Sequence, residues 1–459
     1  YDDLRYSGES VYDCDFSEFV TSGTYYLYVP GVGRSYDFRI AEDVYDDAYY
    51  KAARALYFQR CGIELDSTHA HPWTHGVCHA ADATVHASCA NTSLYNGETI
   101  GEVIPMPRGW HDAGDYGKYV PTAVITLFDL FLAYEFYPEK FPDNHLNIPE
   151  SGNGVPDILD EAKWELDWLL QMQTADGGVY FKTTTTGWPD WMPDVDTATR
   201  WIAEKTTFTT AQFAAIMANA YRQLLPYFPA YADTCLARSH RAWQFLANHP
   251  DPVPADGFVN AAGIGGGEYT DPLGDVDERA WAAAELYKST GNPDFDTAFA
   301  FYWLQHQSTW GWNSFQHSQT RASLTYVTTK DYPTDSSYVE EYIDRVRDGC
   351  NNYLIPRTDT NSYRCAYRSD VIPWIGWGSY AQSSIYAWAF IRGFFLTGDS
   401  LFLEYAKLNL DVQLGNNPQS MSYITGVGSQ YPMDPLQHPS DHDGIVEPVP
   451  GLPVFGPHS

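Results

Sequence analysis

Beyond the stretch "AEDVYDDAYYKAARALYFQRCG", which ends at Gly62, apolar residues recur with the 3.6-residue period of an α-helix, and this period governs most of the 459-residue chain. In "GVPDILDEAKWELDWLLQMQ" the apolar stripe comprises Val155, Ile158, Ala162, Leu166 and Leu169, and the opposite side comprises Asp160, Lys163, Asp167 and Gln171. The same period predicts helices near residues 119–137, 207–224, 236–248, 277–289, 295–306, 338–349, 380–396 and 401–414. A mainly α fold is therefore expected.

Two predicted helix joints resemble each other. The stretches "ELYKSTGNPDF" and "GFFLTGDSLF" each end a helix at Thr-Gly and begin another shortly beyond the glycine. Gly291 and Gly398 can adopt the left-handed C-cap conformation, and Asn292 and Asp399 can cap the following helices. Stacked hairpins predict a helical barrel or toroid. The long connections over 174–205 and 308–336 are rich in Trp, Thr, Gly and Asp, which favours a binding face.

The first 41 residues have a different pattern. The stretch "TYYLYVPGVGRSYDFRI" alternates in the manner of β-strands around a Pro-Gly turn. These strands are too few to close a sandwich. Residues 1–41 are therefore interpreted as the C-terminal part of a β module that begins upstream, and residues 42–459 as the helical domain. The opening "YDDLRYSGES" is not a signal peptide, which suggests a mature or trimmed segment.

The charge and the aromatic content limit the classes of partner. Asp plus Glu number 59 against 27 Lys plus Arg, a formal charge of -32, which repels phosphate backbones and anionic lipids. Nucleic acid and membrane partners are therefore not expected, and no apolar run reaches the roughly 18 residues of a membrane helix. Aromatic residues make up 16 % of the chain; their faces suit sugar rings, although a large core accounts for most of them.

The stretch "RGWHDAGDYGKYV" places Asp112 and Asp115 on either side of an Ala-Gly pair. The glycine permits a tight turn, so both carboxylates can point at one small volume and take a proton from a shared water molecule. An Asx turn or a helix N-cap explains the same spacing without chemistry.

Cysteine and histidine residues precede and adjoin this turn. Cys61, Cys78, His79 and His111 form a complete tetrahedral ligand set for a structural zinc ion. The alternative is a disulfide between Cys61 and Cys78 with two surface histidines. The seven cysteines are too few and too scattered for a disulfide scaffold.

An acidic, glycine-rich stretch, "GGGEYTDPLGDVDERAWAAAELY", lies before a predicted helix. Its carboxylates, which include Asp277 and Glu278, suit calcium. Acidic residues also gather before helices because they stabilise the helix dipole, so both interpretations stay open.

Several of these stretches carry a resemblance to a known family. The motifs "GWHDAGDYGKY", "SGNGVPDILDEAKWELDWLLQMQTADGGVYFK", "DERAWAAAELYKSTG" and "LGNNPQSMSYITGVG" resemble, in the same order, segments of glycoside hydrolase family 9, the cellulase family, in the branch with an N-terminal immunoglobulin-like module. The resemblance implies an (α/α)6 barrel after the last strands of that module. It also implies secretion to the extracellular space or periplasm, and inverting cleavage of β-1,4-glucosidic bonds in cellulose, related β-glucans or their oligosaccharides.

The resemblance also implies residue roles. Asp115 matches the catalytic base and Asp112 the aspartate that helps to hold the water. The zinc ligands of this branch match Cys61, Cys78, His79 and His111, and the calcium ligands of some members match Asp277 and Glu278. Independently of the resemblance, the loop tryptophans Trp310, Trp312, Trp374 and Trp377 are candidate sugar platforms, and the sequence equally allows them a place in the core.

Two departures separate this chain from the family pattern. Where the family has His-His-Arg, "PMDPLQHPSDHDG" places Leu436, Gln437 and His438, and either His438 or His442 could substitute in sugar binding. The family's general acid is a glutamate that lies beyond the last residue, Ser459, so the domain is expected to be incomplete at its C-terminus. These departures leave two alternatives: an exo-β-glucosaminidase on the same fold, and a catalytically weak glycan-binding relative.

Overall fold

The computed structural model describes residues 2–3, 9–80, 82–114, 116–270, 274–305, 317–367 and 379–456. The chain divides into two compact units. The larger unit comprises Leu56–Tyr342 and Leu436–Ile445, and the smaller unit comprises Tyr1–Ala55, Ile343–Pro435 and Val446–Ser459. The predicted boundary between residues 41 and 42 stays a prediction.

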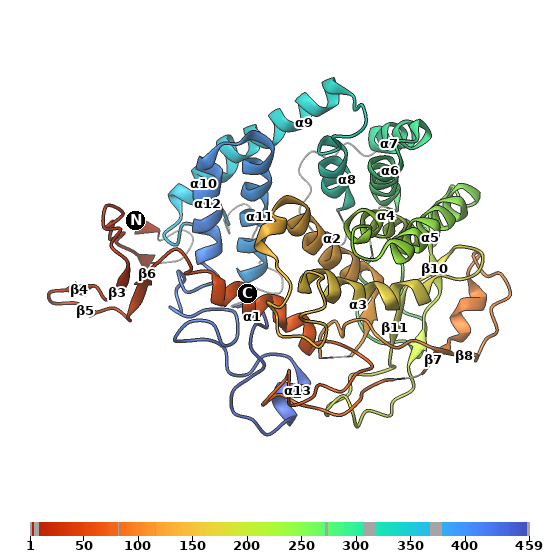
Figure 1. Ribbon diagram of the computed structural model, residues 1–459, viewed down its shortest axis with the longest axis horizontal. Coiled ribbons are helices and arrows are strands. Elements are labelled where there is room, and N and C mark those ends of the chain that lie inside the picture. The colour runs from red at the N-terminus through yellow and green to blue at the C-terminus, as the bar shows by residue number, and fades with distance from the viewer. Residues whose placement is uncertain are drawn as a thin grey trace. The chain divides into compact units, whose positions relative to one another are not determined.

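Helices dominate the described parts of both units (Figure 1). The larger unit contains α2 (Val120–Phe136), α3 (Asp157–Met172), α4 (Thr207–Leu224), α5 (Pro229–Asn248), α6 (Val276–Thr290), α7 (Pro293–Gln305), α8 (Ser318–Val327), the short α13 (His438–His442) and the 3-10 turns η1 (Ala87–Asn91) and η2 (Pro138–Lys140). The smaller unit contains η3 (Cys350–Leu354), α10 (Ile355–Thr360), α11 (Ser379–Thr397) and α12 (Ser400–Asp411). The helices α1 (Asp46–Phe58) and α9 (Ser336–Gly349) cross the division. No described helix is both long enough and apolar enough to span a membrane.

The predicted hairpin joints are confirmed. Gly291 ends α6 in the left-handed conformation with φ 67°, and Gly398, which follows α11, has φ 72°. Asp399 caps α12 by accepting from the Leu401 backbone N–H at 3.0 Å, and the Asn292 side chain accepts from the Asp294 backbone N–H at 3.0 Å. In the larger unit α4 packs against α5 and α6 packs against α7, so consecutive helices pair as the sequence predicts.

The helical period predicts α3 only in part. Asp160 was expected on the polar side of this helix, but it is buried and accepts a hydrogen bond from Asn153 at 3.0 Å. Burial raises the pKa of Asp160 to about 7. The helices α1, α8, α10 and α13 were not predicted. The buried side chains of α8 are mostly Ser, Gln, Thr and Arg, and they find their partners across the fold, so this helix has no apolar stripe to detect.

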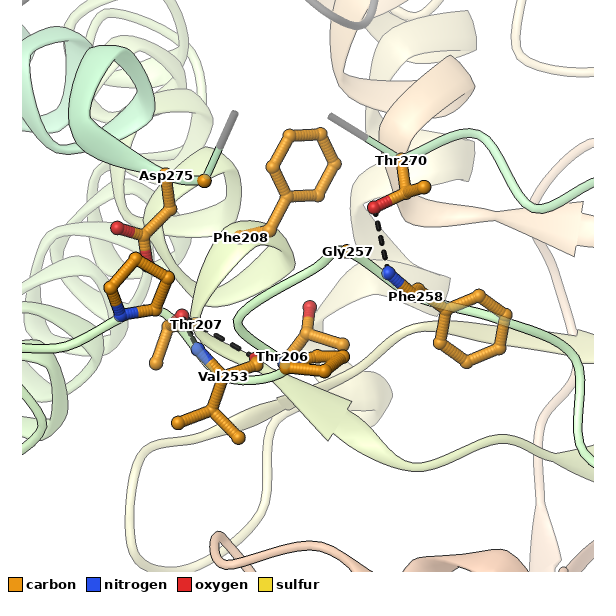
Figure 2. Close-up of a pocket in the computed structure, with 11 residues that line it drawn as sticks. Thr206, Thr207, Phe208, Val253, Gly257, Phe258, Thr270 and Asp275 are labelled. Atoms are coloured by element: carbon orange, nitrogen blue, oxygen red, sulfur yellow. Dashed lines mark hydrogen bonds between the residues drawn. The ribbon is translucent and has the colours of Figure 1, made fainter. Parts of the chain in front are cut away.

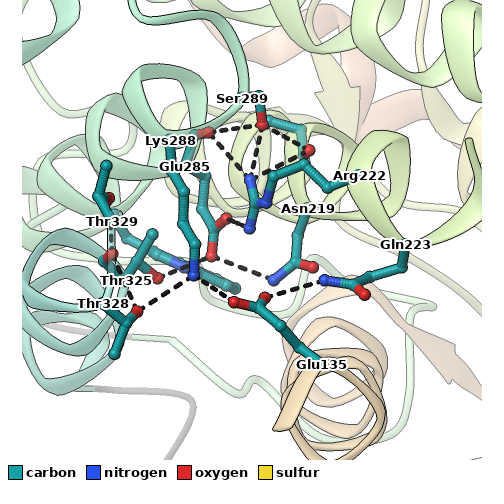
Figure 3. Close-up of polar contacts among 12 residues, drawn as sticks. Glu135, Asn219, Arg222, Gln223, Glu285, Lys288, Ser289, Thr325, Thr328 and Thr329 are labelled. Carbon is teal, nitrogen blue, oxygen red and sulfur yellow. Dashed lines mark hydrogen bonds and ion pairs between the residues drawn. The ribbon is translucent and has the colours of Figure 1, made fainter. Parts of the chain in front are cut away.

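Four helices of the larger unit share a buried polar network at their C-terminal turns (Figure 3). Glu135 of α2 and Lys288 of α6 form an ion pair at 2.5 Å, and Glu285 of α6 forms another with Arg222 of α4 at 2.5 Å. Thr325 of α8 donates to the Glu285 carboxylate at 2.8 Å. Because the network joins the same end of each helix, α2, α4, α6 and α8 run in the same direction.

The smaller unit holds the N-terminal strands as antiparallel pairs. The pairs are β1 (Asp2–Asp3) with β2 (Glu9–Ser10), β3 (Gly23–Tyr25) with β6 (Phe38–Ile40), and β4 (Tyr28–Val29) with β5 (Gly33–Arg34). The β4–β5 hairpin confirms the strands predicted around the Pro-Gly turn. Their origin in an immunoglobulin-like module stays a prediction.

A five-stranded sheet of the larger unit gathers segments that are far apart in the sequence. Its order is β8 (Val103–Pro105), β7 (Asp82–Val85), β12 (Trp201–Ile202), β11 (Lys182–Thr184) and β9 (Lys118–Tyr119). Only the β12–β7 pair is parallel. A separate pair joins β10 (Val179–Tyr180) to β13 (Lys205–Thr206). The strand β9 fixes the chain immediately after the predicted catalytic turn.

A small pocket lies beside the N-terminus of α4 (Figure 2). Val253 N–H donates to the Thr207 hydroxyl at 2.9 Å, and Phe258 N–H donates to the Thr270 hydroxyl at 2.8 Å. The Phe258 ring stacks on Phe181 with centroids 3.9 Å apart. The pocket has room for about one water molecule. Because a sugar ring cannot enter this space, the pocket is structural.

Candidate active site

The turn that carries Asp112 is fixed at both ends. Before it, Trp110 forms a β-bridge with Arg60, and His111 N–H donates to the Gln59 carbonyl at 2.8 Å. Within it, Asp112 N–H donates to the Gly117 carbonyl at 2.8 Å. After it, Lys118 enters strand β9. The backbone of the predicted "HDAGD" turn is therefore held by residues outside the motif.

Helix α3 lies beneath the turn and supplies two buried carboxylates. Glu165 accepts from the Trp110 backbone N–H at 2.5 Å, and Glu161 accepts from the Trp110 indole N–H at 2.7 Å. Glu161 also pairs with the buried Arg60 at 3.0 Å. Gly109, with φ 78°, packs so closely on α3 that a Cβ atom there would lie 2.9 Å from the Trp168 Cβ. A side chain at this position would push the turn away from the helix.

Glu165 and Lys118 are two buried ionisable groups beneath the turn, and the charge of each affects the pKa of the other. Burial raises the pKa of Glu165 to about 8, although the Lys118 ammonium opposes this shift. Burial likewise lowers the pKa of Lys118 to about 8. The Lys118 ammonium donates to the carbonyls of Met106 at 2.6 Å and Arg108 at 2.7 Å, so it also ties down the chain before the turn.

Asp112 is half-buried, and its carboxylate accepts a hydrogen bond from the Tyr269 hydroxyl at 2.8 Å. Asp112 does not cap α2, which begins at Val120 with Tyr119 as an N-cap residue that makes no side-chain cap. The helix-cap interpretation of Asp112 is therefore wrong. Asp115 lies outside the described residues. Tyr269 was not predicted, although it lies in the acidic loop that the sequence marked as a calcium site.

The predicted metal ligands come together. One ligand atom from each of Cys61, Cys78, His79 and His111 lies within 4.8 Å of all the others. The His79 Nδ1 and His111 Nε2 atoms are 3.2 Å apart. Cys61 and Cys78 are both buried and both free, so the structure does not contain the alternative disulfide between them. The donor set and its spacing can hold a zinc ion.

The surroundings of this cluster favour a bound cation. A hydrogen bond between the two cysteines lowers the pKa of the Cys61 thiol well below its usual range, which favours the Cys61 thiolate, and raises the pKa of the Cys78 thiol. Burial lowers the pKa of His111 to about 4, so this imidazole is neutral as a ligand must be. His79 Nε2 lies 3.1 Å from an Asp196 carboxylate oxygen, an arrangement that orients a metal-binding imidazole. His79 adopts φ 39°, a strained backbone that the fold maintains.

His438 lies beside the turn, and its predicted role in sugar binding stays a prediction. A Cβ atom added to Gly114 would lie 3.4 Å from the His438 Nε2 atom. Tyr116 lies between His438 and the four-ligand cluster, with its ring centroid 5.8 Å from that of His438 and 4.9 Å from that of His111. The Tyr116 hydroxyl donates to the Trp191 carbonyl at 2.8 Å, which brings the 174–205 connection to the same place. This is the connection whose composition predicts a binding face.

The predicted sugar platforms Trp310, Trp312, Trp374 and Trp377 all lie outside the described residues. Two other tryptophans are exposed in the 174–205 connection, Trp188 at 54 % and Trp191 at 45 %. The Trp191 indole N–H donates to Asp196 at 3.2 Å, the same carboxylate that contacts His79. The composition of this connection is rich in Trp, but these two residues were not among the predicted sugar platforms.

The predicted calcium ligands have protein partners. Asp277 accepts from the Ser318 backbone N–H at 2.8 Å, and Glu278 accepts from the Ser318 hydroxyl at 2.9 Å. Both side chains are buried at the N-terminus of α6. Within the described ranges they belong to no cluster of metal-ligand type. Calcium binding here stays a prediction.

Comparison with known proteins defines the class. The sequence model of Glycosyl hydrolase family 9 matches residues 45–459. Endoglucanase D of Acetivibrio thermocellus is 33 % identical over 98 % of this chain and 69 % of its own length. A metagenome-derived family 9 endoglucanase has a crystal structure that matches with a TM-score of 0.90 and 34 % identity, over 100 % of this chain and 80 % of that one. A zinc-binding triple mutant of the family 9 endoglucanase J30 matches with a TM-score of 0.86 and 31 % identity, over 97 % and 80 % of the two chains.

These matches identify a glycoside hydrolase of the endo- or exo-glucanase type with a mainly α, (α/α)6 barrel fold. The chain belongs to glycosyl hydrolase family 9. The predicted family and fold class are therefore confirmed.

Proposed function

We propose that the chain hydrolyses β-1,4-linked glucans with inversion, with Asp115 as the general base and Asp112 as the residue that helps to hold the attacking water. The observation that carries this proposal is the Asp112 carboxylate, which sits on a turn fixed from both sides and is oriented by the Tyr269 hydroxyl rather than used as a helix cap. An oriented carboxylate of this kind can accept a hydrogen bond from water without first reorganising.

The reaction needs two proton transfers. The base takes a proton from the water as its oxygen bonds to the anomeric carbon, and a general acid protonates the departing glycosidic oxygen. In an inverting enzyme the two groups are about 6.5–9.5 Å apart, which leaves room for the water. We assign no residue to the general acid. Tyr269, by donating to Asp112, orients that carboxylate as a hydrogen-bond acceptor.

The substrate follows from the relatives and from the exposed aromatics. The relatives above are named endoglucanases, which favours internal cleavage of a β-glucan over the exo-β-glucosaminidase alternative. Trp188 and Trp191 supply exposed aromatic faces in the 174–205 connection, and the tryptophans predicted from sequence would add to them. Since polymeric glucan lies outside cells, we place the enzyme outside the cytoplasm.

The test of this function is the anomer and length of the first products. Purified protein is incubated with carboxymethyl cellulose, xyloglucan, cello-oligosaccharides and chito-oligosaccharides, and new reducing ends are followed by NMR. We expect α-configured reducing ends from the β-glucans, with a rapid fall in polymer viscosity. The control variant is Asp233→Asn, which changes an exposed aspartate of α5 outside the proposed site and should give the same products as the wild type. Retention of the β-configuration, or activity on chito-oligosaccharides alone, would contradict the proposal.

We also propose that Cys61, Cys78, His79 and His111 hold one structural zinc ion. Bound zinc would join the chain at 61, 78–79 and 111 by coordination, and so fix the approach to the Asp112 turn. The Asp196 carboxylate on His79 Nε2 leaves Nδ1 as the ligand atom. In this role the metal stabilises the turn and takes no part in proton transfer.

Zinc content and thermal stability test this site. Cys61→Ser is expected to lose about one equivalent of zinc and to lower the Tm, because structural zinc contributes folding energy. Cys235→Ala, at another buried free cysteine, is the control and is expected to keep its zinc. Equal zinc content in both variants, measured by elemental analysis, would overturn the assignment. Calcium at Asp277 and Glu278 is a separate proposal, supported if added Ca²⁺ raises the Tm of the wild type but not of Glu278→Gln.

A further inference from the structure

The segment Leu436–Ile445 contains a second group of potential metal ligands. His438 and His442 lie four residues apart on α13, so their rings project from the same face of one helical turn. Asp190, from the connection between β11 and β12, approaches both rings. One ligand atom from each of the three residues lies within 4.8 Å of the others. Two imidazoles at this spacing and one carboxylate form a common ligand set for divalent transition metals.

We propose that Asp190, His438 and His442 form a second metal site that binds Zn²⁺ or a similar divalent transition metal, separate from the four-ligand cluster. The Asp190 Oδ1 atom lies 3.1 Å from His442 Nε2 and 3.9 Å from His438 Nδ1. Ligand atoms around a tetrahedral zinc ion with bonds of about 2.0–2.1 Å are about 3.3 Å apart. Small rotations of these side chains therefore bring all three atoms to bonding distance.

The two sites differ in kind. The four-ligand cluster is largely buried and has two sulfur donors, whereas the second site has three nitrogen and oxygen donors and includes Asp190, whose side chain is 81 % exposed. Three protein ligands leave one position for water or another ligand. The metal in the second site is therefore expected to be the weaker bound and the more readily exchanged.

The site would connect two segments at the catalytic turn. His438 is 10 % exposed, and its Nε2 edge faces Gly114 while its Nδ1 edge faces Asp190. A metal bound to Nδ1 would fix this ring and leave the Nε2 edge directed toward the turn. It would also join α13 to the 185–200 loop, a segment that lies far from α13 in the sequence. Of the three residues, His438 stands at a position where the chain departs from the family's His-His-Arg pattern.

Zinc stoichiometry and a thermal shift test the second site on the full chain. Protein is dialysed against a weak chelator, which leaves the sulfur-rich cluster loaded, and is then equilibrated with Zn²⁺ alone. Wild type is expected to bind about one equivalent more than His442→Ala, and Asp190→Asn is expected to behave like His442→Ala. Added Zn²⁺ is expected to raise the Tm of the wild type, because binding to the folded state stabilises it, and to leave the Tm of His442→Ala unchanged.

The matched control is His71→Ala, which removes an exposed histidine outside the group and is expected to bind as much zinc as the wild type. Equal zinc in the wild type, His442→Ala and Asp190→Asn would overturn the proposal and leave only an ion pair between Asp190 and His442. Equal loss in His71→Ala and His442→Ala would also overturn it, because that result describes nonspecific binding to surface histidines. Cys61→Ser separates the two sites, since it is expected to keep the exchangeable equivalent.

Discussion

Helix α2 has a buried polar cluster at each end. At its C-terminal end Glu135, Arg222, Glu285 and Lys288 form two ion pairs, so positive and negative charges balance (Figure 3). Asn219, Gln223 and Thr325 fill further positions around these carboxylates. At the N-terminal end the cluster contains the Asp112 turn, the four convergent residues that could hold a metal ion, and His438. Of these two clusters, only the one at the N-terminal end of α2 brings carboxylate, thiol and imidazole groups close together.

The difference shows how to separate structural from functional polar groups in this enzyme. In the C-terminal network, removing a charge leaves its buried partner uncompensated, which costs stability. At the N-terminal turn, removing a carboxylate removes a group with a proposed catalytic role from a backbone that other residues already hold. Substitutions at one end should therefore change stability, and those at the other end should change activity.

The largest effect is expected from Asp115→Asn. A positioned base contributes about 10²–10⁴-fold, so kcat on soluble β-glucan should fall by that range while the Tm stays close to that of the wild type. Steady-state kinetics and thermal unfolding of the same preparation make the measurement. Asp233→Asn is the control. A loss of activity matched by a large fall in Tm would place Asp115 with the structural groups.

Glu285→Gln should give the converse result. The Arg222 guanidinium would lose its carboxylate, and breaking a buried pair costs about 3–5 kcal/mol in the free energy of unfolding. Urea unfolding measures the loss, and kcat per folded molecule should be unchanged. Glu139→Gln, just beyond α2 and exposed, is the control. If Glu285→Gln were as stable as the wild type, the C-terminal cluster would not have the structural role that distinguishes it from the N-terminal one.

Tyr269→Phe should have a smaller effect on activity. A hydrogen bond to a charged group contributes about 1.5–3 kcal/mol, so we expect kcat to fall by about tenfold to a hundredfold. The acid limb of the rate profile should move to higher pH, because the carboxylate pair loses a donor that favours its charged form. Tyr231→Phe removes a similar hydrogen bond, to Asp167 at 2.8 Å, and should leave the profile unchanged. An unmoved acid limb in Tyr269→Phe would mean that the tyrosine has only a packing role.

The two ends of α2 should also differ in the pH dependence of their contribution to stability. Burial raises the pKa of Glu165 to about 8 from 4.5, so the folded state holds an extra proton and stability falls as pH rises between these values. At the other end burial would raise the pKa of Glu135, but the Lys288 ammonium and Arg222 guanidinium lower it below 4.5 overall. Stability from Glu135 is therefore present above about pH 4.5 and lost as pH falls below that value.

Urea unfolding across this pH range distinguishes the two carboxylates. Glu165→Gln should flatten the decline toward alkaline pH, and Glu135→Gln should flatten the decline toward acid pH. The glutamine in Glu165→Gln can still accept from the Trp110 N–H, so the change isolates the charge. The same slope in both variants would show that the two ends titrate alike.

The sequence predicted most of the helical fold because burial leaves a local record. The apolar period marked α2, α4 and α6, the chemistry of Gly291 marked the joint between α6 and α7, and that of Gly398 and Asp399 marked the joint between α11 and α12. It failed for α8, whose buried side chains are mostly polar, and for Asp160, whose carboxyl is buried against Asn153. In both cases a partner from another element compensates the polar group, and a local period does not report such a partner.

By itself the sequence determined the family and predicted the candidate metal-ligand set and the turn that carries Asp112, because each rests on residue types at fixed short spacings or on long motifs in order. Only the tertiary structure brought Tyr269 to Asp112 across 157 positions, placed Glu165 beneath Trp110, and joined Asp190 to His438 and His442. These contacts depend on the course of long loops and on the packing of α3 under the turn. A side chain that acts from a distant loop leaves no periodic or spacing signal, since its position is set by the backbone that carries it.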